Sequence, residues 1–89
     1  MVPSLQPQPV DEQLIDLLCK RDGRLTTVVL NDGRQLHVLT IAWGYDWQDT
    51  HAHVTTNCSP GARGMRLDFF FTNEVVSVVG DDGSVLYRQ

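Results

Sequence analysis

The feature that most constrains the fold is a hairpin signal in the first half of the chain. A run rich in β-branched residues, Leu25 to Leu30, leads directly into Asn31-Asp32-Gly33. These three residue types readily adopt the positive φ angles that a tight turn between antiparallel strands requires. A returning strand must follow, and residues 35–43 supply it. The sequence therefore predicts antiparallel β-structure across this segment.

The returning strand is partly apolar on both of its faces. Alternation places Leu36, Val38, Thr40 and Ala42 on one face, and His37, Leu39, Ile41 and Trp43 on the other. A strand of this kind is expected where a strongly bent sheet rolls up, because one strand then serves two packing layers of a small barrel.

The rest of the chain continues this β pattern. Residues 51–57, 65–71 and 75–79 are predicted as strands, and residues 84–88 as a last strand that either closes the barrel or pairs with an edge. In the strand over 65–71, alternation predicts that four apolar side chains point inward: Met65, Leu67, Phe69 and Phe71.

A single helix is predicted before the strands, over residues 11–21. Its apolar positions, Leu14, Ile15, Leu17 and Leu18, follow helical spacing, and Asp11 is expected to cap its start. Residues 1–9 are rich in proline and glutamine and are predicted as a flexible tail.

The predicted domain organisation is one helix-plus-β-barrel domain over residues 10–89, because a chain of 89 residues builds one core. The predicted fold class is mostly β, a small Sm-like or SH3-like barrel. It has about five to six antiparallel strands preceded by one N-terminal α-helix.

The net charge and the length of the apolar segments limit which classes of function are expected. The formal net charge is −4, whereas a protein that holds phosphates normally carries a basic face. Direct nucleic-acid binding is therefore disfavoured, and a basic protein partner suits the chain better. No apolar run approaches a membrane span and no signal-peptide pattern begins the sequence, so the cytoplasm is expected. In that setting Cys19 and Cys58 are predicted as reduced, buried thiols.

The order of elements resembles that of a known family. A helix ending in Leu17-Leu18-Cys19, the Asn31-Asp32-Gly33 hairpin, a polar loop and a third strand lead to Arg66-Leu67-Asp68 and a valine-rich strand. This pattern is similar to the Rho-binding antiterminator (Rof) family over most of residues 10–79. The resemblance implies an Sm-like barrel fronted by a helix. It also implies a regulator that docks on the hexameric transcription termination factor Rho and blocks its access to RNA, an antitermination function.

The resemblance also implies which residues meet the partner. In the family, acidic residues at the start of the helix meet basic residues of Rho, and the matching positions here are Asp11, Glu12 and Asp16. The alternative is that these carboxylates only stabilise the helix dipole, which acids in the first turn do without any partner.

A loop with clustered aromatic residues forms a second candidate contact. Trp43 is expected in the core and Tyr45 as a lid over the barrel, whereas Trp47 has polar neighbours on both sides. An exposed tryptophan is typical of an interface. The loop residues predicted to bind a partner are Asp46, Trp47 and Asp49.

The sequence offers no pattern for catalysis, a cofactor or a metal. His51 and His53 project from one strand face, but the remaining ligands of a closed metal site are missing. Cys58 is the only candidate nucleophile, and little near it in sequence would lower the pKa of its thiol. We therefore expect a non-enzymatic binding protein of undetermined oligomeric state. Two alternatives stay open: an Sm-like module that assembles as a ring and binds RNA, and an inhibitor of another cellular machine.

Overall fold

The computed structural model describes residues 9–46 and 50–89, and the statements below concern these residues. They form one helix, α1 (Pro9–Lys20), and two antiparallel sheets. The four-stranded sheet has the order β2-β1-β6-β7, from β1 (Thr26–Leu30), β2 (Gln35–Val38), β6 (Val75–Gly80) and β7 (Val85–Arg88). The three-stranded sheet has the order β3-β4-β5, from β3 (Ile41–Gly44), β4 (His53–Thr56) and β5 (Phe69–Phe71).

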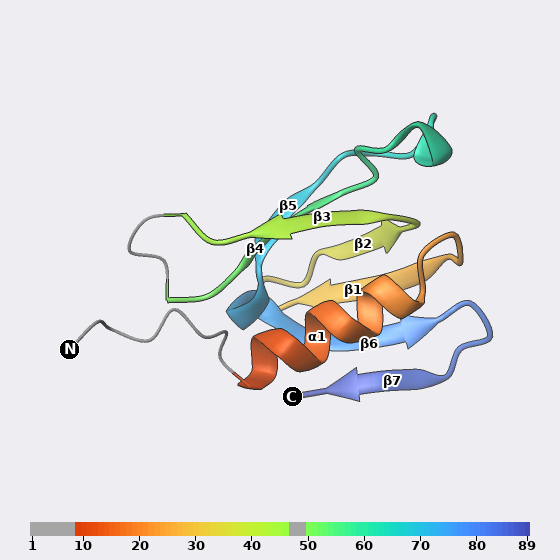
Figure 1. The fold of residues 1–89 in the computed structure, drawn as a ribbon. Helices are drawn as coiled ribbons and strands as arrows, with labels where there is room; N and C mark the ends of the chain where they lie inside the picture. The colour runs from red at the N-terminus through yellow and green to blue at the C-terminus, as the bar shows by residue number, and fades with distance from the viewer. Residues whose placement is uncertain (1–8, 47–49) are drawn as a thin grey trace.

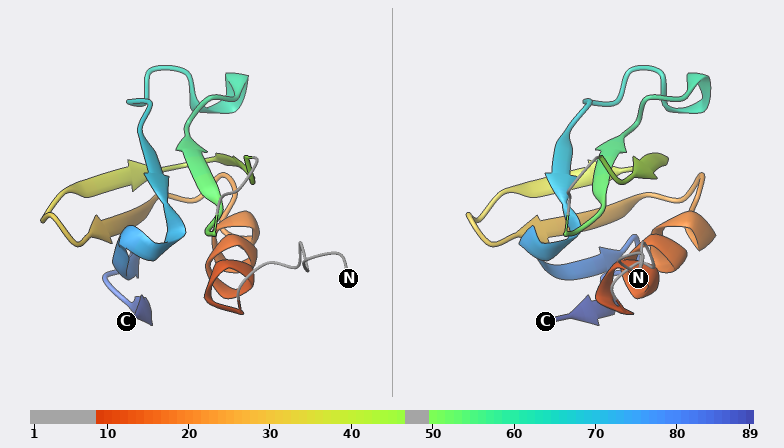
Figure 2. Two further views of the ribbon diagram at one scale, coloured as in Figure 1. Left: turned by 90° about the vertical axis from the view of Figure 1, so that its left-hand side faces the viewer. Right: turned by 60° about the vertical axis from the view of Figure 1, so that its left-hand side comes forward.

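The two sheets cross one another, and α1 lies along one side of the four-stranded sheet (Figure 1). Figure 2 shows β4 and β5 running steeply across the direction of β1 and β2. Short 3-10 helices at Pro60–Ala62 (η1) and Thr72–Glu74 (η2) flank β5 in sequence. The prediction of a mostly β domain with one N-terminal helix is confirmed. The strands form two separate ladders, however, and do not close into a barrel.

The predicted hairpin is present, and the returning strand bends as expected. β1 pairs with β2 around a turn in which Gly33 has a φ of 91°. The predicted single strand over 35–43 breaks at Leu39 and Thr40, so that β2 belongs to one sheet and β3 to the other. Residues 35–43 thus contribute a strand to each of the two sheets.

Asn57 holds this bend in place. Its Oδ1 accepts hydrogen bonds from the backbone N–H groups of Leu39 (2.7 Å) and Thr40 (3.3 Å). Its amide nitrogen donates to the carbonyl oxygens of His37 (2.9 Å) and Arg66 (2.8 Å). Asn57 also has a φ of 59°, a left-handed conformation that asparagine tolerates better than most residues. A buried side chain therefore replaces the ladder where the strand bends.

The core lies between α1 and the inner faces of the two sheets. The inward apolar side chains of the helix and of both sheets form one buried cluster there. The cluster comprises Leu14, Leu18, Val28, Leu30, Leu36, Val38, Val54, Phe70, Val75 and Val78. None of the described helices has the length and apolar character needed to cross a membrane.

The inward face predicted for residues 65–71 is wrong. Only Phe69–Phe71 form a strand, and Phe70 is its buried residue, opposite buried Val54. Leu67 is 60% exposed and Phe69 is 49% exposed. Three consecutive phenylalanines make both faces apolar, so alternation alone could not select the inner one.

Two further burial predictions are also wrong. Cys19 and Cys58 are both exposed free thiols. Trp43, expected in the core, is 47% exposed, because β3 is an edge strand and its face extends past the packed interior. The helix begins at Pro9, so Asp11 lies inside its first turn and not at a capping position.

Candidate functional site

Asp11 is a fully buried carboxylate and not a surface acid. Its relative exposure is 0%, although the resemblance implies that it meets a partner at the start of the helix. An isolated buried charge is costly, so its oxygen atoms require hydrogen-bond donors from the surrounding structure. Those donors come from residues far away in the sequence.

Four groups from two other segments contact the carboxylate. Oδ2 accepts hydrogen bonds from the hydroxyl of Tyr45 (2.6 Å) and the backbone N–H of Ala52 (2.9 Å). Oδ1 accepts one from the hydroxyl of Thr72 (2.5 Å) and lies 3.1 Å from Nδ1 of His51. Asp11 thus joins the first turn of α1 to the β3–β4 loop (residues 45–52) and to η2.

These donors decide the charge state of Asp11. Burial alone raises the pKa of its carboxyl, but the hydrogen bonds from Thr72, Tyr45, His51 and Ala52 together lower the pKa below its ordinary value of 3.8. The group is ionised at neutral pH. A buried, fully bonded carboxylate holds its neighbours in place but cannot offer its charge to a partner.

The Asp11 network places two exposed acids at one end of the molecule. Glu12 follows Asp11 on the exposed side of the helix, and Asp46 follows Tyr45 with its side chain 77% exposed. Figures 1 and 2 show the first turn of α1 at the same end as the finish of β3 and the start of β4. We call Glu12 and Asp46 the acidic end.

Of the other predicted contact residues, Asp16 neighbours Glu12 on the exposed face of the helix, and two lie outside the described residues. Asp16 is exposed one helical turn further along and forms an ion pair with Lys20 (2.8 Å). Trp47 and Asp49, predicted to bind a partner, fall outside the described residues. The flanking residues Asp46 and Thr50 are both exposed.

A row of aromatic rings on the three-stranded sheet was not predicted as a site. The rings of His53 and Phe69 are stacked with centroids 5.7 Å apart, and Phe71 meets Phe69 edge-on at 5.4 Å. Nδ1 of His53 lies 3.7 Å from Oδ2 of Asp46, so this row adjoins the acidic end. We call His53, Phe69 and Phe71 the aromatic face. Three consecutive phenylalanines are the sequence signal for this row, but alternation predicts Phe69 and Phe71 as inward-pointing and so does not indicate a surface site.

The two histidines of β4 and its preceding loop each face an aspartate. His51 approaches Asp11 and His53 approaches Asp46, so the pair does not converge. Within residues 9–46 and 50–89, no three histidine, cysteine or carboxylate side chains gather as metal ligands.

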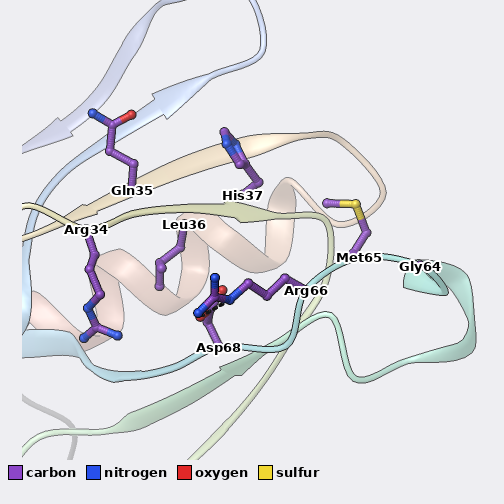
Figure 3. Close-up of a pocket in the computed structure, with 8 residues that line it drawn as sticks. All are labelled: Arg34, Gln35, Leu36, His37, Gly64, Met65, Arg66 and Asp68. Carbon is purple, nitrogen blue, oxygen red and sulfur yellow. Dashed lines mark ion pairs between the residues drawn. The ribbon is translucent and has the colours of Figure 1, made fainter.

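An open cavity of 420 Å³ lies between β2 and the segment before β5 (Figure 3). Its charged groups are already engaged: Arg66 lies 3.3 Å from Asp68, and Arg34 lies 2.8 Å from Asp32. Figure 3 shows Arg66 and Asp68 pointing toward one another and Arg34 apart from them. Because these cations are neutralised locally, the cavity is a weaker candidate than the acidic end.

Comparisons with known proteins gave no relative. No protein-family model, no curated protein and no solved structure matches this chain.

Proposed function

We propose that this protein is a non-catalytic regulator that binds a basic protein partner through its acidic end. The observation that carries the proposal is the Asp11 network. It joins the start of the helix to the β3–β4 loop, the two segments in which contact residues were predicted independently. Two exposed carboxylates, Glu12 and Asp46, then lie at the same end of the molecule.

The pairing of the other charges supports this surface. Most cations of the described residues lie against carboxylates of their own neighbourhood, so they do little to offset the acidic end. The pairs are Lys20 with Asp16, Arg21 and Arg24 with Asp81, Arg34 with Asp32, and Arg66 with Asp68. Complementary fields of this kind speed encounter with a basic partner and orient it.

The first candidate partner is transcription termination factor Rho. This candidate rests on the resemblance to the Rho-binding antiterminators; the single N-terminal helix and the sharply bent second strand agree with an Sm-like or SH3-like fold, although the two sheets do not close into a barrel. Binding to Rho would block its access to RNA and would place the protein in the cytoplasm. If another basic machine is the target, the same acidic end is expected to make the contact.

The test is the affinity of purified Rho hexamer for the protein and for three charge reversals. Glu12→Lys and Asp46→Lys each change the acidic end, and Asp22→Lys makes the same charge change at the opposite end of α1. We expect the first two to weaken binding about tenfold or more and Asp22→Lys to change it less than about twofold. Circular dichroism checks that all three remain folded.

The same preparation tests the regulatory role. The parent protein should displace single-stranded RNA from Rho, and its affinity should fall as salt rises, because exposed charges dominate the contact. If all three variants bound Rho equally well, the acidic end would not be part of the contact with Rho. The proposal would be contradicted if the parent protein did not bind Rho. It would also be contradicted, in favour of the RNA-binding alternative, if the parent protein itself bound RNA tightly at physiological salt.

A further inference from the structure

Phe69 is the exposed member of the aromatic face, whereas His53 and Phe71 are partly buried, and none of the three belongs to the core cluster. Register places His53 opposite Phe71 and Thr55 opposite Phe69 on the outer side of the three-stranded sheet. The inner side of the same strands is filled by Val54 and Phe70, which are 0% and 1% exposed. A single exposed apolar residue needs no explanation, but a contiguous cluster of apolar rings at the surface is a candidate interaction site.

The aromatic face is open to approach from its side. β5 is an edge strand that pairs with β4 alone in the described sheet. On the far side of β4 from β5, the outer side of β3 carries the exposed Ala42 and Gly44, and a Cβ at Gly44 would lie 3.5 Å from the ring of His53. The ring of His53 already stacks with Phe69, so a side chain from another molecule would reach the half-exposed Phe69 from the open edge of β5.

The negative charge beside the aromatic face indicates which kind of chemical group it can bind. The carboxylate of Asp46 lies at its border, and the net charge of the chain is −4. Among the described residues, no lysine or arginine of the chain stacks on Phe69 or Phe71. Negative potential around exposed rings attracts a cation and repels a phosphate backbone, which disfavours stacked nucleotides.

We propose that the aromatic face binds an arginine side chain of the basic partner, with its guanidinium over Phe69 and directed toward Asp46. The identity of that partner rests on the proposed function, whereas the chemistry of the contact does not. Arginine is favoured over lysine because its planar, weakly hydrated guanidinium stacks on aromatic rings while its N–H groups bond a carboxylate. Lysine offers a strongly hydrated point charge and no stacking plane.

The test is a titration of the isotope-labelled protein, followed by NMR, with a blocked peptide containing two arginines. A second peptide carries lysine at both positions, and oligouridine serves as the nucleic-acid probe. We expect the arginine peptide to shift the ring signals of Phe69 and Phe71 and the carboxylate signal of Asp46. It should bind about two- to fivefold more tightly than the lysine peptide.

Substitutions locate the contact. Phe69→Thr should abolish the arginine preference, and Phe69→Leu, which keeps an apolar side chain and the fold, should abolish it as well. Val85→Thr makes a comparable change at an exposed residue of the other sheet and should leave it intact. Equal binding of both peptides, shifts away from the aromatic face, tighter binding of oligouridine, or self-association through Phe69 would each overturn the proposal.

Binding to Rho then separates the two claims. If Rho binds the parent and Phe69→Leu equally well, the aromatic contact is wrong and the proposed function stands. If the arginine peptide binds at Phe69 but Rho does not bind the parent, the aromatic contact stands and a different basic partner must be sought.

Discussion

Asp11 shows how one residue can determine where a candidate site lies. It reads as an ordinary acid in the first turn of a helix, and nothing in its sequence neighbours distinguishes it from Glu12. The donors that make it a buried anchor are Tyr45, His51 and Thr72, 34 to 61 positions away. Contacts of such separation are set by the tertiary fold, so the sequence alone could not identify them.

Replacing Asp11 by asparagine should destabilise the protein by about 1–3 kcal/mol at neutral pH. The new amide group places N–H donors against a site whose neighbours are themselves donors, so at least one buried group loses its acceptor. Asp16→Asn removes only an exposed ion pair and should cost less than about 0.5 kcal/mol. Urea unfolding at pH 7 measures both, and equal losses would contradict the anchoring role.

The same substitution predicts a change in the pH dependence of stability. Because the folded pKa of Asp11 lies below 3.8, the unfolded chain binds the proton more readily than the folded one. The stabilisation is therefore present above pH 3.8 and is lost as the pH falls through the lower folded pKa. The stability difference between parent and Asp11→Asn should shrink over that window. A difference that is constant from neutral to acid pH would be incompatible with an ionised, bonded carboxylate.

Asn57 is a second residue that the sequence did not identify. We expect Asn57→Ala to cost about 2–4 kcal/mol, because four backbone groups lose a buried partner and alanine is strained at positive φ. Asn57→Gly loses the same hydrogen bonds but accepts the backbone conformation, so it should be less destabilising by about 1 kcal/mol. Thermal or urea unfolding compares them. If the two variants were equally destabilised, the positive φ at position 57 would not contribute to the loss. If neither were destabilised, the hydrogen bonds of Asn57 at the bend would not stabilise the fold.

At the scale of elements, local sequence signals predicted which helices and strands form but not which face of each strand is buried. The β1–β2 hairpin and the helix follow from turn chemistry and 3.6-residue spacing, which act over a few residues. The bend between β2 and β3 was foreseen because residues 35–43 are apolar on both faces, but its position depends on Asn57. The inner face of β5 depends on pairing with β4, which the run Phe69–Phe71 does not encode.

The connection between α1 and the β6–β7 turn gives a prediction at this scale. Arg21 donates from Nε to the hydroxyl of Thr26 (3.0 Å) and from its terminal nitrogen to Asp81 (3.1 Å), with only 11% of its side chain exposed. Arg24 reaches the same Asp81 at 3.4 Å but is 60% exposed. Arg21→Ala should therefore cost about 1–3 kcal/mol and Arg24→Ala less than about 1 kcal/mol. Urea unfolding that ranks them in the opposite order would contradict this assignment.

At the scale of the whole molecule, the proposed binding function rests on the distribution of charge and of exposed aromatic residues. β6 is paired on both edges, by β1 and β7, which leaves only the outer strands for pairing with a neighbour. The cations are largely neutralised locally, and the acidic end adjoins the aromatic face through Asp46 and His53. Carboxylates beside exposed rings suit a basic protein surface better than an RNA backbone.

Hydrogen–deuterium exchange of the protein with and without Rho tests the acidic end most directly. If this end is the contact surface, binding should slow exchange in peptides covering the first turn of α1 and the β3–β4 loop. Peptides from β7 and from the β1–β2 turn should exchange as in the free protein. Protection confined to β7 or the β1–β2 turn, or no protection at any Rho concentration, would contradict the account.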